Sequence, residues 1–66
     1  MNPRYPNVTV QLTGSDGNAF AVIGKVNREL RRAGVTADVI EEFTTEATRG
    51  DYNHLLRTAM AWVEVE

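Results

Sequence analysis

Two short polar motifs hold most of the side chains that could bind a ligand. They are Gly14-Ser15-Asp16-Gly17-Asn18 and Arg49-Gly50-Asp51-Tyr52-Asn53-His54. Each stands just before an expected helix, where free backbone N–H groups and the positive end of the helix dipole favour an anion. Arg49 adds a charged fork, Tyr52 a flat ring and Asn53 an amide, which suit a phosphate, a ribose or a base. The expected ligand-binding set is Ser15, Asp16, Gly17, Asn18, Arg49, Asp51, Tyr52, Asn53 and His54.

A simpler role for the same polar side chains stays open. Asp16 or Asn18, and likewise Asp51, can accept hydrogen bonds from the first turn of the helix that each precedes. A glycine-rich turn is a weak signal by itself, and this one is neither a Walker nor a dinucleotide-binding motif. Two carboxylates would also repel a phosphate unless they are turned inward as caps or contact a ribose hydroxyl.

His54 is the one histidine of the chain, which has no cysteine. Nucleophilic catalysis would need a nucleophile beside His54 and Asp51, and the pattern offers neither a cysteine nor an adjacent serine. One histidine with scattered carboxylates is also a weak set of metal ligands. We therefore expect a structural or capping role for His54, with ligand contact as the alternative. The sequence predicts no catalytic residue, no metal and no cofactor, so an enzyme is the least expected class.

A second set of residues suits a nucleic acid. Lys25, Arg28 and Arg32 share one side of an expected helix, with Arg31 beside them. This side either binds phosphates or is a solvated face that balances the acidic residues of the next helix. A strand before the helix would present Thr9, Gln11 and Thr13 outward. The alternative nucleic-acid set is therefore Thr9, Gln11, Thr13, Lys25, Arg28 and Arg32.

The elements that position these residues follow from hydrophobic periodicity. Residues 1–6 contain two prolines and are expected to form an extended arm. Residues 8–12 alternate as a half-buried strand, and helices are expected at 18–33, 36–50 and 51–63, the last residues leaving the helix as a short strand. The fold class is α+β and mostly helical, in a single domain over residues 1–66. The first strand must pair with residues 62–66 or with the same strand of a second chain.

Packing expectations follow from the same pattern. Short connections make neighbouring helices antiparallel, which brings the two polar motifs to the same end. Gly24 is expected to allow close packing of the first helix, and Met60 to lie on the apolar face of the third. The expected core is Phe20, Ile23, Val26, Leu30, Ile40, Phe43, Leu55, Leu56 and Ala59.

Size and charge bound the function further. A chain of 66 residues buries a limited core and has no disulfide to support it, so we expect a homo-oligomer. No apolar run reaches the length of a membrane span, and no signal peptide is expected, which together favour the cytoplasm. The formal net charge of −2 makes a nucleic acid the less favoured partner.

Several motifs together resemble a family of short proteins encoded by phages and prophages. They are Leu12-Thr13-Gly14, Asp16-Gly17-Asn18-Ala19-Phe20-Ala21, Ala33-Gly34, Glu46-Ala47-Thr48, Gly50-Asp51-Tyr52-Asn53-His54-Leu55-Leu56 and Trp62-Val63. The resemblance spans nearly the whole chain. It implies a phage accessory protein in the host cytoplasm and no catalytic residues. A second similarity, in architecture, is to ribbon–helix–helix DNA-binding proteins, from which the turn at 14–18, the longer first helix and the third helix depart.

Three classes of function remain. The first is a non-enzymatic binder of a small anionic, nucleotide-like ligand that sequesters an immune signal of the host. The second is a DNA-binding regulator of the ribbon–helix–helix type, and the third is a protein–protein adaptor or inhibitor.

Overall fold

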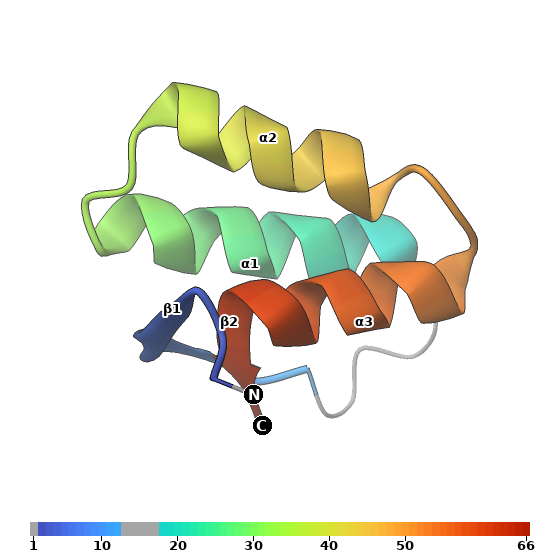
Figure 1. The fold of residues 1–66 in the computed structure, drawn as a ribbon, viewed down its shortest axis with the longest axis horizontal. Coiled ribbons are helices and arrows are strands. Elements are labelled where there is room, and N and C mark those ends of the chain that lie inside the picture. The colour runs from blue at the N-terminus through green and yellow to red at the C-terminus, as the bar shows by residue number, and fades with distance from the viewer. Residues whose placement is uncertain (1, 13–17) are drawn as a thin grey trace.

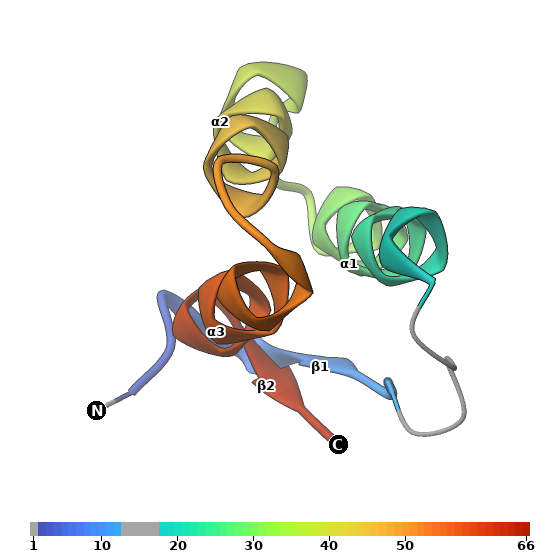
Figure 2. The same ribbon diagram turned by 90° about the vertical axis from the view of Figure 1, so that its right-hand side faces the viewer.

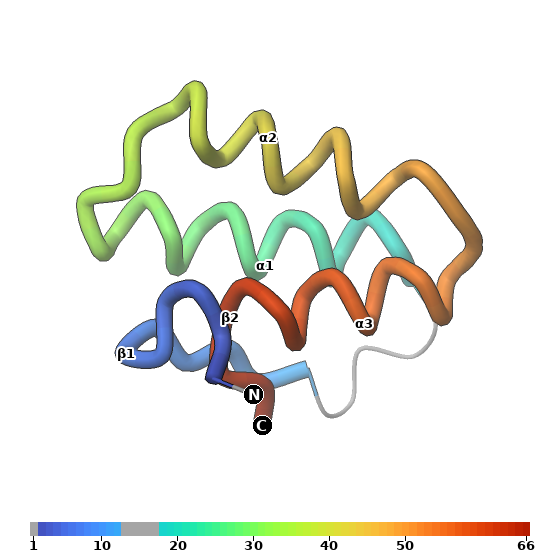
Figure 3. Tube along the Cα trace, in the orientation of Figure 1, coloured from blue at the N-terminus to red at the C-terminus, as the bar shows by residue number. Residues whose placement is uncertain are grey.

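The computed structural model describes residues 2–12 and 18–66 of the chain. Its elements, in chain order, are β1 (Tyr5–Val10), α1 (Ala19–Arg32), α2 (Ala37–Ala47), α3 (Tyr52–Trp62) and β2 (Val63–Val65). Figure 1 shows the three helices stacked above the two short strands, and Figure 3 follows the same path along the Cα trace. The predicted α+β fold, mostly helical and with a short C-terminal strand, is confirmed.

The two strands pair in parallel. Parallel pairing needs a long crossover connection, and the three helices between β1 and β2 supply it. Beyond the strand ends, the Leu12 N–H donates to the Glu66 carbonyl and the Glu66 N–H donates to the Val10 carbonyl, both at 2.9 Å. The predicted pairing with residues 62–66 is therefore confirmed, and one edge of β1 is occupied within the chain itself.

The first strand begins earlier than its apolar alternation predicts. β1 starts at Tyr5 and includes Pro6, so these two residues belong to the sheet and not to the extended arm. The register with β2 shifts between Tyr5 and Thr9. Proline lacks an N–H and is tolerated at such an irregularity or on an edge strand, which is why it did not end the strand.

Arg4 joins the N-terminal segment to the helices. Its guanidinium carbon lies 4.4 Å from the centre of the Trp62 ring, and Nη1 pairs with Glu42 Oε1 at 3.3 Å. The Tyr5 ring stacks on Trp62 with their centroids 6.0 Å apart. These contacts hold the start of β1 against the end of α3 and the outer side of α2.

Both ends of α1 form as the sequence predicts. Asn18 Oδ1 accepts from the Ala21 N–H at 3.2 Å and so caps the first turn. At the other end Gly34 has φ +89°, a conformation that suits glycine. The Gly34 N–H donates to the Arg31 carbonyl and the Val35 N–H to the Leu30 carbonyl, the paired bonds of a Schellman motif.

The remaining helices run as expected. Thr36 stands at the N-cap position of α2, although its side chain accepts no hydrogen bond from the first turn. Asp51 Oδ1 caps α3 by accepting from the His54 N–H at 2.9 Å. Figures 1 and 2 show that α1 and α3 begin at the same end of the molecule while α2 runs the opposite way, so the antiparallel arrangement is confirmed.

The core lies between the inner face of the sheet and the three helices. Phe43 is fully buried and meets the Trp62 ring edge-on, with centroids 5.4 Å apart. Among the described residues, the buried apolar side chains are Val8, Val10, Val22, Val26, Leu30, Ile40, Phe43, Ala47, Leu55, Ala59, Trp62 and Val63. Ile23 and Leu56, also predicted in the core, are partly buried against it.

Three packing predictions are wrong. Phe20 is 88% exposed and Met60 is 61% exposed. At about 100° per residue, Phe20 lies about 120° around α1 from the buried Val26, outside the stripe that faces the core. Gly24 does not allow close packing either, because a Cβ built there meets nothing within 4 Å.

Candidate functional site

We call the end of the molecule where α1 and α3 begin the helix-start end. The residues that cap these two helices form hydrogen bonds within the protein. Asn18 and Asp51 each accept a backbone hydrogen bond from the helix that they begin. The capping interpretation is thus confirmed for both residues, and Asn18 Oδ1 and Asp51 Oδ1 already have backbone donors. Three further residues of the predicted ligand-binding set, Ser15, Asp16 and Gly17, lie outside the described residues, as does Thr13 of the alternative set.

His54 closes the end of the preceding helix. Its Nε2 lies 2.9 Å from the Glu46 backbone carbonyl and 3.4 Å from Thr58 Oγ1. A carbonyl only accepts, so Nε2 carries a proton and donates to it. The Glu46 carbonyl also accepts from the Arg49 N–H at 3.2 Å, so His54 is its second donor at the C-terminal end of α2. The structural role expected for His54 is confirmed.

Arg49 sits among carboxylates. Its Nη1 pairs with Glu46 Oε2 at 2.9 Å, where the Arg49 side chain is largely exposed and that of Glu46 is half-buried. The hollow beside it is lined by Asp38, Glu41, Glu42, Thr45, Glu46 and Arg49. Four acidic side chains against one guanidinium make this surface unfavourable for a phosphate.

The remaining residues of the predicted set do not converge on Arg49. Tyr52 faces a separate apolar hollow, whose lining residues are Leu12, Tyr52, Leu56, Met60, Val65 and Glu66. Asn53 is exposed on α3. The helix-start end therefore brings caps and acidic groups together, and the positive charge that an anion needs is weak there.

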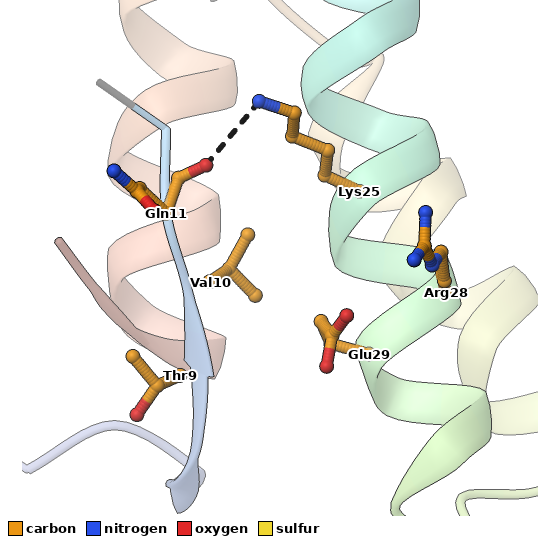
Figure 4. Close-up of a pocket in the computed structure, with 6 residues that line it drawn as sticks. All are labelled: Thr9, Val10, Gln11, Lys25, Arg28 and Glu29. Carbon is orange, nitrogen blue, oxygen red and sulfur yellow. Dashed lines mark hydrogen bonds between the residues drawn. The ribbon is translucent and has the colours of Figure 1, made fainter. Parts of the chain in front are cut away.

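The alternative residues do come together. An open groove of about 540 Å³ lies between β1 and α1, and its lining residues are Thr9, Val10, Gln11, Lys25, Arg28 and Glu29. We call it the basic groove (Figure 4). Arg32 lines the hollow that continues it along α1, again with Thr9 and Glu29. Five of the six residues of the predicted nucleic-acid set thus border one continuous surface.

The charge of this surface is opposite to that of the whole protein. Within the described part of the chain, Lys25, Arg28 and Arg32 line it with a single carboxylate, Glu29, whereas the whole sequence carries a net charge of −2. Arg32 Nη1 pairs with Glu29 Oε2 at 3.4 Å. Among the described residues, no ion pair or hydrogen bond holds the Arg28 side chain. Its guanidinium is therefore available to an anion.

Lys25 joins the two walls of the basic groove. Its Nζ donates to the backbone carbonyl of Gln11 at 3.4 Å. Figure 4 shows the Val10 side chain pointing toward α1 and those of Thr9 and Gln11 pointing away from it. β1 therefore lines the groove with the buried Val10 side chain and with backbone groups such as the Gln11 carbonyl, and the side chains of Thr9 and Gln11 stand on the other face of the sheet.

That outer face is acidic. Thr9 is the register partner of Glu64, and neighbours in a sheet point to the same side. Both side chains are exposed. A carboxylate beside Thr9 opposes a DNA major groove, where a ribbon–helix–helix protein would place these side chains. The sequence did not reveal this, because the acidic neighbour is supplied by β2 at the far end of the chain.

The described residues contain neither a cluster of metal ligands nor a membrane-spanning helix. Within residues 2–12 and 18–66, no group of three or more histidine, cysteine, aspartate or glutamate side chains lies close enough together to hold a metal ion. None of the described helices is long and apolar enough to cross a membrane.

Comparison with known proteins finds no matching family model, no matching curated protein and no matching solved structure. The similarity to the short phage and prophage proteins rests on the sequence motifs quoted above and stays a prediction.

Proposed function

We propose that this protein is a non-enzymatic binding protein that holds an anionic ligand in the basic groove between β1 and α1. One observation carries the proposal: Lys25, Arg28 and Arg32 line a continuous surface on which Glu29 is the one carboxylate among the described residues, on a protein whose net charge is negative. Arginine and lysine side chains supply charge-assisted hydrogen bonds, the strongest kind that such a surface can offer to an anion.

The ligand proposed here is anionic, as the sequence predicts. Its proposed site is the basic groove and not the helix-start end. At the helix-start end the described polar atoms serve as caps or pair with carboxylates. In the basic groove Arg28 has no such partner among the described residues. With the phage and prophage resemblance, this supports an accessory protein of the host cytoplasm that sequesters an anionic signal, such as a nucleotide.

The test is a binding screen with matched variants. Inorganic pyrophosphate, a cyclic dinucleotide and a glutamate-rich peptide are titrated at low ionic strength and followed by calorimetry. We expect Arg28→Gln to weaken binding of the responding probe by about 1.5–3 kcal/mol, the size of a hydrogen bond to a charged group. Arg57→Gln removes the same charge from an exposed position on α3 and should leave the affinity unchanged.

Two outcomes would contradict the proposal. If Arg49→Gln abolishes binding and Arg28→Gln does not, the anion binds at the helix-start end. If no anionic probe binds at all, the protein has no anion site and an adaptor function replaces the proposal.

A further inference from the structure

β1 has one edge that β2 does not occupy. Val10 and Leu12 turn their backbone groups toward the C-terminal segment, where they bond Glu66. Backbone groups alternate sides along a strand, so the N–H and carbonyl groups of Thr9 and Gln11 face the opposite edge. The bond from Lys25 Nζ to the Gln11 carbonyl confirms that this edge faces α1. In the described part of the chain the sheet has no third strand on that side.

The free edge of β1 and the basic side chains of α1 lie along the same groove. Thr9 and Gln11 line one wall, and Lys25 and Arg28 line the other, with Arg32 just beyond. Along the helix axis Lys25 and Arg28 are about 4.5 Å apart, and Arg28 and Arg32 about 6 Å. In an extended chain, side chains on one face repeat about every 6.6 Å. Alternate residues of a strand lying in the groove can therefore meet successive basic residues of α1.

The other edge of β1 already accepts a strand of this kind. β2 and the residue after it read Val63-Glu64-Val65-Glu66, with a carboxylate at every second position. This segment pairs with β1 through backbone hydrogen bonds. The backbone of β1 thus tolerates an acidic neighbour on one side, where no basic residue of α1 compensates the charge. On the groove side, Lys25 and Arg28 would compensate it.

Resting on the anion-binding function proposed above, we propose that the ligand is an extended acidic segment of another polypeptide, which adds as a strand to the free edge of β1. Its backbone bonds the N–H and carbonyl groups of Thr9 and Gln11, the mode by which exposed sheet edges bind peptides. Its inward-facing carboxylates pair with Lys25, Arg28 and Arg32. Specificity then requires acidic residues at alternate positions, because adjacent ones would point to opposite faces.

Lys25 exchanges partners when the segment binds. In the free protein its ammonium group lies on the Gln11 carbonyl. This bond occupies a carbonyl at the edge of β1, so an incoming strand has to displace the Lys25 ammonium group before it can bond there. An acidic segment offers Lys25 a carboxylate instead, and the Gln11 carbonyl then accepts a backbone N–H of the segment. A neutral strand offers no such exchange.

The experiment compares three labelled seven-residue peptides of identical charge, in which glutamate alternates with threonine. One is the unmodified parent, and each of the other two carries N-methyl groups on the backbone nitrogens of one of the two alternating sets of residues. Fluorescence anisotropy follows binding to the whole chain. We expect the parent peptide to bind, at least one methylated version to bind about tenfold or more weakly, and Arg28→Gln to weaken the parent peptide about tenfold. Arg57→Gln should have no effect.

Each other outcome overturns a defined part of the proposal. If both methylated versions bind as well as the parent, the contact is electrostatic only and no strand is added. If pyrophosphate, a cyclic dinucleotide or a single-stranded oligonucleotide binds with a dependence on Arg28 and the peptide does not, the peptide is excluded while the anion-binding function stands. If no anionic probe binds, both proposals fall.

Discussion

His54 donates from Nε2 to the backbone carbonyl of Glu46 across 2.9 Å, so the first turn of α3 closes the last turn of α2. The glycine between the two helices makes this approach possible. A Cβ at Gly50 would stand 2.8 Å from the Cβ of His54 and 2.9 Å from its Cγ. Gly50 is not among the residues with positive φ, a set that contains Gly34 alone in the described chain. Space beside His54, and not backbone conformation, therefore requires a glycine at Gly50.

We expect Gly50→Ala to lower the free energy of unfolding by about 1–3 kcal/mol, the usual cost of forcing an extra methyl group into an occupied space. Urea unfolding followed by circular dichroism measures it. His54→Ala should cost less in the Gly50→Ala background than in the parent, because the clash has then lost its partner. Two additive effects would contradict the contact.

Gly24→Ala is the matched control. Gly24 lies inside α1 and a Cβ there meets open space. Alanine should therefore raise the free energy of unfolding by about 0.5–1 kcal/mol through its higher helix propensity. The two glycine variants are predicted to move stability in opposite directions.

Phe43→Ala should lower the free energy of unfolding by about 3–5 kcal/mol, because the ring is fully buried and its removal leaves a cavity. Phe20→Ala removes the same ring from a position that is 88% exposed and should change stability by less than about 0.5 kcal/mol. Thermal unfolding of the two variants beside the parent distinguishes them. Equal losses would mean that Phe20 also packs in the core.

Asp38 gives a prediction for pH. The Thr36 hydroxyl, with further help from the backbone N–H groups of Asp38 and Val39, holds the pKa of Asp38 below its ordinary 3.8. A pKa that is lower in the folded state stabilises the fold above the unfolded pKa, and this contribution is lost as pH falls through the folded pKa. Thr36→Val should raise the pKa of Asp38 in a carbon-detected NMR titration. An unchanged pKa would show that the hydroxyl does not contact the carboxylate.

Self-association stays a prediction, and Met60 is the residue that tests it. The Met60 side chain is 61% exposed beside Leu56 and Tyr52 on an apolar hollow. We expect the parent to sediment as a homo-oligomer and Met60→Glu to lower its mass at the same concentration. Thermal stability at high dilution serves as the control, since an exposed side chain adds little to the core. A parent that sediments as a monomer would contradict self-association.

Local chemistry made much of this fold predictable. The caps Asn18 and Asp51, the stop at Gly34 and the period of each helix depend on residues a few positions apart, so the sequence contains the whole signal. Phe20 was misplaced because it lies about 120° around α1 from Val26, outside the stripe of buried side chains that faces the core. Gly24 was misjudged because nothing in the sequence says whether a helical glycine faces another backbone or solvent.

The candidate site was less predictable because it depends on long-range pairing. The residue types were found, since Lys25, Arg28 and Arg32 recur at helical spacing and Thr9 and Gln11 alternate along the strand. Their arrangement was not, because the edge of β1 that stays open depends on which side β2 joins. The acidic character of the outer face has the same origin, since Glu64 reaches Thr9 only after the chain has crossed three helices.

The most direct test of the central claim is an amide chemical-shift map of the isotopically labelled protein, titrated with the peptide that alternates glutamate and threonine and, separately, with pyrophosphate. Binding in the basic groove predicts that the largest shifts appear at Thr9, Gln11, Lys25 and Arg28. The Arg28→Gln variant should lose these shifts and Arg57→Gln should keep them. Shifts centred on residues 49–54 with both probes, or no shifts at all, would contradict the account.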